Sequence, residues 1–184
     1  MMNRQRCHWV ENASELYQSY HDEEWGVPLV DDHRMIETLI LESFHTGLSW
    51  LIILKKRPAF RLAFDNFDLD KIVNYNDDKI MELLNNKDIV RHKGKILATI
   101  ENAKALQAIQ KEFHSFSAYL WGFTDNKIIV KRDDQMTKDE LSDKIAKDMK
   151  KRGIKFMGSV TVYSYLQAVG IIDAHQTKCF KAHQ

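Results

Sequence analysis

The chain has 184 residues, of which 44% are hydrophobic and 29% charged, and its formal net charge at pH 7 is only +1. This composition is typical of a globular protein with a sizeable core, and the near-neutral charge excludes a uniformly basic surface, so nucleic acid would need a local basic patch. The longest apolar run is too short to span a bilayer, and no apolar stretch follows the polar residues 1–7 as in a signal peptide. We therefore expect a cytoplasmic protein with no membrane partner.

Apolar residues recur mostly at helical spacing, with only two prolines and seven glycines to interrupt them. This pattern predicts an all-α fold. Asn12 to Glu15 fits a capping box that opens a short helix through Tyr20. We expect residues 22–28 to form a loop.

The next predicted helix begins at Asp31 or Asp32 as its N-cap and ends at Gly47. Ser49 is expected to cap a helix that runs to about Lys56. Pro58 suits the first turn of a separate helix over residues 58–64. Asp68 and Asn76 then start two short helices.

A long helix is predicted from Ile96 to about Lys111, after the basic residues 91–95, and Ser115 opens another through Trp121. Residues 124–136 are the most irregular stretch. Residues 127–131 within it have the pattern of an extended segment, but the sequence offers no strand partner.

Near the C-terminus, Thr137 to Glu140 fits a second capping box, for a helix that runs to Lys151. A turn over residues 152–158 leads to a last helix over residues 159–169. We find no internal repeat and no clean linker, so the sequence indicates a compact helical domain with one or two lobes.

Glu42 is the one carboxylate in the apolar stretch 39–50. Burial raises the pKa of a carboxyl group unless a cation or a hydrogen-bond donor stabilises its charged form. Glu42 is therefore a candidate working group in a pocket, and Trp50 is close enough in sequence to help line it. The alternative is a glutamate on the solvated face of an amphipathic helix, and this stretch alone does not decide between them.

Cys7 and His21 near the N-terminus could combine with His175 and Cys179 near the C-terminus. Two thiolates and two imidazoles are a usual ligand set for structural Zn²⁺. His175 and Cys179 would share a face if their segment is helical. Spacing alone leaves open the alternative of two buried thiols and two surface histidines.

The turn at residues 152–158 contains Gly153 and Gly158, and Lys155 lies between them. The helix that starts at Ser159 presents free backbone N–H groups, which form an anion site that suits a DNA phosphate. The alternative is a solvated, lysine-rich turn.

Four aromatic residues lie close in sequence to the candidate ligands Cys7 and His21. They are Trp9, Tyr17, Tyr20 and Trp25. Such a group is either core or a set of stacking walls for a planar ligand.

Together these groups resemble the 3-methyladenine DNA glycosylase I family over essentially the whole chain. The matching segments are RCHWV at 6–10, YHDEEWGVP at 20–28, LE…GLSW at 41–50, LKKR at 54–57, RHKGK at 91–95, KKRGIKFMG at 150–158 and AHQTKC at 174–179. They occur in the order of the family. The resemblance favours the functional interpretation over each alternative above.

The resemblance implies one domain, residues 1–184, with a bilobal helix-hairpin-helix DNA glycosylase fold and the motif itself at about 141–169. It implies a monomer that hydrolyses the N-glycosidic bond of 3-methyladenine in alkylated double-stranded DNA and releases the free base. The implied pocket acid is Glu42. The other implied site residues are Tyr20, Trp50, Trp9 and Trp25 around the base, Gly47, Leu48, Lys155, Gly158 and Ser159 on DNA, and Cys7, His21, His175 and Cys179 on a structural Zn²⁺.

The sequence departs slightly from the family pattern beside the pocket acid. His45 stands where family members often carry glutamine, and Thr46 stands where alanine is common. They bear on fine specificity more than on the reaction. Asp173 is interpreted as structural, and no lysine is expected to act as a Schiff-base nucleophile. A DNA-binding module without catalysis is the competing function, and the presence of Glu42 with both pocket aromatics argues against it. A zinc hydrolase would need an open metal position, which four protein ligands do not leave.

Overall fold

The computed structural model describes residues 4–132 and 135–182, and it is mostly helical. The elements in these ranges are α1 (Glu15–Glu23), α2 (Asp32–His45), α3 (Trp50–Ala63), α4 (Leu69–Ile72), α5 (Asp77–Asn85), α6 (Lys93–Phe113), α7 (Phe116–Trp121), α8 (Glu140–Lys151), α9 (Ser159–Ala168), β1 (Ile129–Val130) and β2 (Ile172–Asp173). Short 3₁₀ turns lie at His8–Val10, Asp65–Phe67 and Gly122–Thr124.

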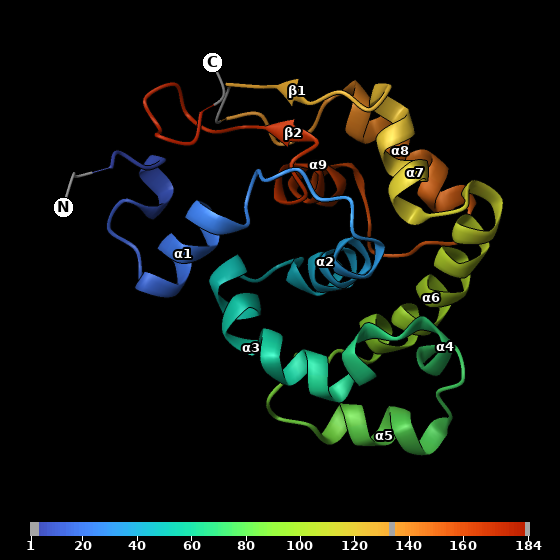
Figure 1. Cartoon of the computed structure of the whole chain (residues 1–184). Coiled ribbons are helices and arrows are strands. Elements are labelled where there is room, and N and C mark those ends of the chain that lie inside the picture. The colour runs from blue at the N-terminus through green and yellow to red at the C-terminus, as the bar shows by residue number, and fades with distance from the viewer. Residues whose placement is uncertain (1–3, 133–134, 183–184) are drawn as a thin grey trace.

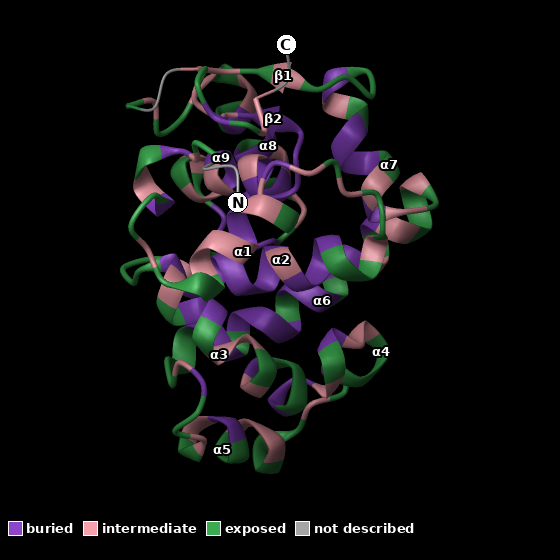
Figure 2. Cartoon of the chain, turned by 60° about the vertical axis from the view of Figure 1, so that its left-hand side comes forward, coloured by how far each residue is buried: buried purple, intermediate pink, exposed green. Residues whose placement is uncertain are grey.

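Helix α2 lies near the centre of the molecule, with α3, α4 and α5 on one side and α9, β1 and β2 on the other (Figure 1). It contacts α3, α6, α7 and α9, and its apolar face is fully buried at Met35, Leu39 and Ile40. Buried residues line the facing sides of α2 and α6 (Figure 2). Within the described part of the chain, no helix is both long and apolar enough to cross a membrane.

The predicted extended segment does find a strand partner. Ile129 of β1 pairs with Ile172 of β2, and Val130 pairs with Asp173, in a parallel register. The expectation of an all-α fold is therefore corrected to a mostly helical fold with one two-stranded sheet. The pairing holds the segment after α9 in place, directly before His175.

Several predicted helix boundaries are wrong, among them the start of α6, which begins at Lys93 rather than Ile96. The N-cap of α1 is Ser14 rather than Asn12, and the helix continues to Glu23, so His21 is helical. Helix α3 runs unbroken through Pro58, where two helices were expected. The capping box of α8 is formed by Asp139 and Ser142 rather than by Thr137 and Glu140.

The loop between α1 and α2 lies against the end of α9. The backbone N–H of Gly26 donates to the carbonyl oxygen of Gln167 at 3.1 Å, and that of Leu29 donates to Val169 at 3.0 Å. Gly170 has φ +74°, and a Cβ there would lie 2.4 Å from the carbonyl carbon of Val27. The approach therefore requires glycine, and it brings the aromatic residues of α1 beside α9.

Asp31 and Asp32 cap different helices. Asp31 accepts from the backbone N–H of Arg34 at 2.8 Å and caps α2 as predicted. Asp32 instead accepts from the N–H groups of Phe116 and Ser117, both at 2.8 Å, at the start of α7. It also accepts from the Gln110 side chain at 2.9 Å, so one carboxylate joins α2, α6 and α7.

We expect Asp32→Ala to lower the free energy of unfolding by about 2–4 kcal/mol, because it removes a charged acceptor from three donors. Asp31→Ala removes one exposed cap and should cost about 1 kcal/mol. Urea denaturation of both variants measures the difference. Equal losses would show that the contacts of Asp32 with α6 and α7 add nothing to stability.

Candidate active site

Glu42 lies in the third turn of α2 with only 2% of its surface exposed. The alternative of a glutamate on a solvated face is therefore wrong. Its carboxylate faces a cavity of about 370 Å³. The cavity is lined by Trp9, Tyr17, Tyr20, Trp25, Glu42, His45, Ser49, Trp50, Ser164, Gln167 and Ala168.

Both oxygens of the Glu42 carboxylate have a partner. Oε2 lies 3.1 Å from Nδ1 of His45, one turn further along α2. The Ser164 hydroxyl on α9 donates to Oε1 at 3.2 Å. Burial raises the pKa of Glu42, and the contacts with His45 and Ser164 offset part of that rise. The site therefore holds a desolvated carboxyl group in a fixed orientation, and a cation beside it would favour its charged form.

Aromatic rings form the walls of this cavity. The rings of Tyr20 and Trp50 lie 5.8 Å apart, and those of Trp9 and Trp25 lie 5.1 Å apart, as measured between centroids. Tyr20 and Trp50 are nearly buried, at 6% and 9% exposed. The Trp50 indole N–H is buried and has no hydrogen-bond partner among the described residues. All four predicted pocket aromatics therefore line the cavity that Glu42 faces.

Sequence reasoning missed Ser164 and Gln167, which α9 places in the wall opposite α2. Their spacing puts both on one face of that helix. Two polar residues at this spacing in a helix that is otherwise rich in buried apolar side chains are a signal that could have found them. Tyr17, noted only as part of the aromatic group, also lines the cavity.

The predicted corner follows directly after α2. Gly47 has φ +85°, a left-handed conformation that favours glycine, and Leu48 is 37% exposed. The structure thus presents an apolar side chain at the surface, three residues after His45, the last residue of the helix that carries Glu42.

The turn between α8 and α9 presents Lys155 and Gly158 to solvent, with Ser159 half-buried at the start of α9. An open groove of about 600 Å³ lies beside these three residues. Arg152 is engaged elsewhere, because its guanidinium pairs with Glu112 and Asp148, at 2.7 Å each. The basic patch of the turn therefore consists of lysines.

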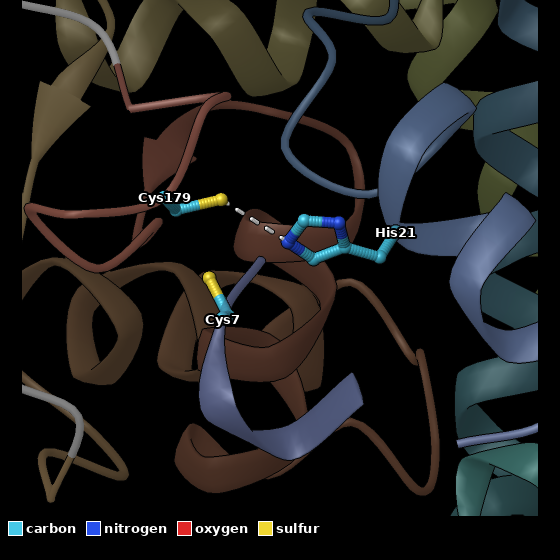
Figure 3. A group of neighbouring side chains, drawn as sticks. All are labelled: Cys7, His21 and Cys179. Carbon is cyan, nitrogen blue, oxygen red and sulfur yellow. Dashed lines mark hydrogen bonds between the residues drawn. The ribbon is translucent and has the colours of Figure 1, made fainter. Parts of the chain in front are cut away.

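Three of the four predicted metal ligands converge (Figure 3). The donor atoms of Cys7, His21 and Cys179 all lie within 4.8 Å of one another. His175 is fully buried, and its ring lies 5.3 Å from that of His21. Its Nε2 has no partner among the described residues. The alternative of surface histidines is wrong, since His21 is fully buried as well.

Carboxylates orient both imidazoles of this cluster. Nδ1 of His21 lies 2.8 Å from Asp22, and Nδ1 of His175 lies 2.8 Å from Asp173. Nε2 of His21 is left to face Cys179 Sγ at 3.5 Å, while Nε2 of His175 remains unpartnered among the described residues. A carboxylate on the other ring nitrogen is how proteins orient imidazoles that bind metal. A Cβ on Gly26 would lie 2.3 Å from Cε1 of His175, so glycine is needed here. This donor set and its surroundings fit Zn²⁺.

A family model described as methyladenine glycosylase matches residues 9–182. The DNA-3-methyladenine glycosylase of Haemophilus influenzae is 39% identical over 178 residues, which cover 95% of this chain and 96% of the relative. DNA-3-methyladenine glycosylase 1 of Escherichia coli is 36% identical, with 95% of each chain covered.

Solved structures agree with these relatives. A crystal structure of 3-methyladenine DNA glycosylase I has a TM-score of 0.93 and 40% identity, and the match covers 97% of this chain and all of that one. A variant of 3-methyladenine DNA glycosylase I in complex with 3-methyladenine has a TM-score of 0.92 and 35% identity, with 97% and 98% covered. The chain has a buried acid in an aromatic cavity, matches the family model along nearly its whole length and shares the fold of the solved structures. It therefore belongs to the methyladenine glycosylase family.

Proposed function

We propose that the protein is a base-excision repair enzyme that hydrolyses the N-glycosidic bond of 3-methyladenine in alkylated DNA. It releases the free base and leaves an abasic site. The observation that carries this proposal is the buried Glu42 carboxylate, held facing an aromatic cavity in a chain of this family. Relatives named for this activity, one of them with 3-methyladenine bound, support it.

The cavity suits the chemistry of the damaged base. Alkylation at N3 makes adenine cationic, and a cation over the faces of Tyr20 and Trp50 gains about 0.5–2 kcal/mol. The carboxylate of Glu42 accepts from the exocyclic amine and offsets the positive charge. Because His45 and Ser164 hold both oxygens, the carboxylate is already oriented before the base enters.

The positive charge also makes the base a good leaving group, so the reaction needs no strong general acid. Water attacks the sugar carbon as the glycosidic bond breaks, and the departing base takes the bonding electrons and becomes neutral. Glu42 acts first through recognition and electrostatics, and activation of the water is its second role. None of the residues described as lining the cavity is a lysine, so strand cleavage through a Schiff base is not expected.

The target base must leave the duplex to enter the cavity, and a base that pairs badly costs less to extrude. In this proposal the corner at Gly47 and Leu48 approaches the gap left in the stack. Helices α8 and α9 form a helix-hairpin-helix motif, and Lys155, Gly158 and Ser159 hold phosphates of double-stranded DNA. One chain supplies every wall of the pocket, which suits a monomer, and the cytoplasm is its expected location.

We also propose a structural Zn²⁺ on Cys7, His21, His175 and Cys179. The ion would join the two terminal segments, whose backbones already meet where Phe180 donates to Gln5 at 2.9 Å. The buried, unpartnered Nε2 of His175 is the observation that supports its place as fourth ligand.

A base-release assay on methylated duplex DNA tests the function. The expected products are free 3-methyladenine, identified chromatographically, and abasic sites in equal amount. Duplex binding without release would identify a DNA-binding module that has lost catalysis.

Duplex binding should weaken steeply as salt rises, because phosphate contacts release counterions. Lys155→Ala should reduce the slope of log K against log salt by about 1. Lys79→Ala, on α5 far from the turn in Figure 1, is the control and should leave the slope unchanged. Equal slopes for the wild type and Lys155→Ala would remove Lys155 from the phosphate contacts.

Excision should fail as pH falls through the pKa of Glu42, because only the carboxylate attracts the cationic base. Burial raises that pKa, so the loss should begin at a higher pH than for an exposed glutamate. Ser164→Ala removes a donor to the charged form and should move the acid limb of kcat/KM to still higher pH. Ser43→Ala is the matched control, because its hydroxyl donates to the carbonyl of Ile40 instead. An acid limb that does not move in Ser164→Ala would contradict this assignment.

A further inference from the structure

Two of the buried polar side chains on helix α6 bond to segments outside the helix and take no part in the base pocket. Lys95 is 6% exposed and Asn102 is fully buried. They are seven residues apart, which is two helical turns, so they project from the same face of α6. Each side chain bonds to the backbone of a segment outside α6.

Lys95 holds the corner that follows the Glu42 helix. Its Nζ donates to the carbonyl oxygens of Phe44 and Thr46, both at 2.9 Å. The last carbonyls of a helix have no partner within the helix, so these two bonds satisfy groups at the end of α2. They fix the backbone directly before Gly47 and Leu48.

Asn102 holds the turn between α8 and α9. Its Oδ1 accepts from the backbone N–H of Lys155 at 2.7 Å, and its Nδ2 donates to the carbonyl oxygen of the same residue at 3.1 Å. Two bonds to one residue fix both the position and the rotation of that peptide segment. The ring of His92, which caps α6, also lies 6.1 Å from that of Phe156 in the same turn.

We propose that Lys95 and Asn102 are positioning residues that make the first half of α6 a spacer between the Gly47–Leu48 corner and the α8–α9 turn. The spacer sets the separation and orientation with which both segments meet one duplex. This inference depends on the proposed DNA contacts of those two segments. A misplacement of about 1 Å in such a contact can cost on the order of 100-fold in rate.

The test compares Lys95→Met and Asn102→Ala with Thr99→Val on the full chain. Thr99 is buried between them on α6, and its hydroxyl donates within the helix to the carbonyl of Lys95, so it is a matched control. We expect both positioning variants to lose roughly 10- to 100-fold in kcat/KM on methylated duplex DNA. Their affinity for free 3-methyladenine, followed by tryptophan fluorescence, should stay at the wild-type value. Thr99→Val should keep both values.

The double variant adds a readout that a loss of stability would not produce. If both residues set the same spacing, the loss of kcat/KM in the double variant should be little larger than that in the more impaired single variant. If their effects are independent, the two losses should multiply. If a single variant does not fold, Lys95→Arg and Asn102→Asp must show the same loss on duplex DNA. Unchanged duplex kinetics, or an equal loss of free-base affinity, would overturn the inference while the proposed function stands. Absence of base release by the wild type would overturn both.

Discussion

Glu42→Gln should lower the excision of 3-methyladenine by about 100- to 1,000-fold while the fold is retained. Glutamine keeps the shape of the side chain but removes the negative charge that faces the cationic base. Single-turnover release from methylated duplex DNA measures the loss directly. Affinity for free, neutral 3-methyladenine should fall much less than the rate, because the charge matters most before the bond breaks.

The stability of Glu42→Gln distinguishes a loss of catalysis from damage to the fold. Burial raises the pKa of Glu42, so the folded state disfavours the charged carboxylate. The free energy of unfolding therefore falls as the pH rises from the ordinary pKa of glutamate through the raised pKa of Glu42. Glu42→Gln should therefore be at least as stable as the wild type at neutral pH. Wild-type turnover in this variant would remove Glu42 from the mechanism.

Glu37→Gln is the matched control, with the same substitution on the same helix. Glu37 is also buried, at 5% exposed, but it pairs with Arg61 at 2.8 Å and is not among the residues that line the cavity. Loss of that pair should reduce stability and leave excision unchanged. The two glutamates thus separate a role in the pocket from a role in the fold.

Local signals in the sequence predicted several helix starts correctly. Asp68, Asn76 and Ser115 each accept a hydrogen bond from a backbone N–H two or three residues ahead. Such caps involve only neighbouring residues, so they are visible in the sequence. The cap that Asp32 provides for α7 is not, because its partners lie 84 and 85 residues away.

The β-strands and the continuation of α3 through Pro58 depended on longer-range interactions. Residues 129–130 have an extended pattern, but their partner is another two-residue segment that follows α9. Pro58 is compatible with the first turn of a helix, yet α3 continues through it, with Leu54 before it and Phe60 after it both buried. Tertiary contacts decided both cases, and single-sequence patterns do not contain them.

The same limit applies to the site. The resemblance located Glu42, the aromatic walls and the cysteine–histidine cluster, because each lies in a recognisable segment. Lys95 and Asn102 act through bonds to the backbone of distant segments, and their own neighbours in sequence give no sign of those bonds. A residue of this kind is found only when the fold brings its partner to it.

Cys7→Ser should abolish stoichiometric zinc and lower the free energy of unfolding by about 4 kcal/mol or more. Without a metal ion, the buried donors of His21, His175 and Cys179 would have too few partners, and the two terminal segments would lose their cross-link. Metal analysis of the purified protein and thermal denaturation measure both effects. His114→Asn, an exposed histidine in a left-handed conformation that asparagine tolerates, should keep its zinc. Unchanged zinc in Cys7→Ser would rule out the site.

Loss of the metal should also alter the base pocket, because two of the tryptophans that line the pocket pack against the histidines of the metal site. Trp9 lies 5.5 Å from the ring of His21, and Trp25 lies 4.7 Å from that of His175. Both tryptophans line the cavity that Glu42 faces. If zinc holds these rings in place, Cys7→Ser should bind free 3-methyladenine more weakly than the wild type even at temperatures where it remains folded. Full affinity in a zinc-free, folded variant would limit the metal to joining the chain ends.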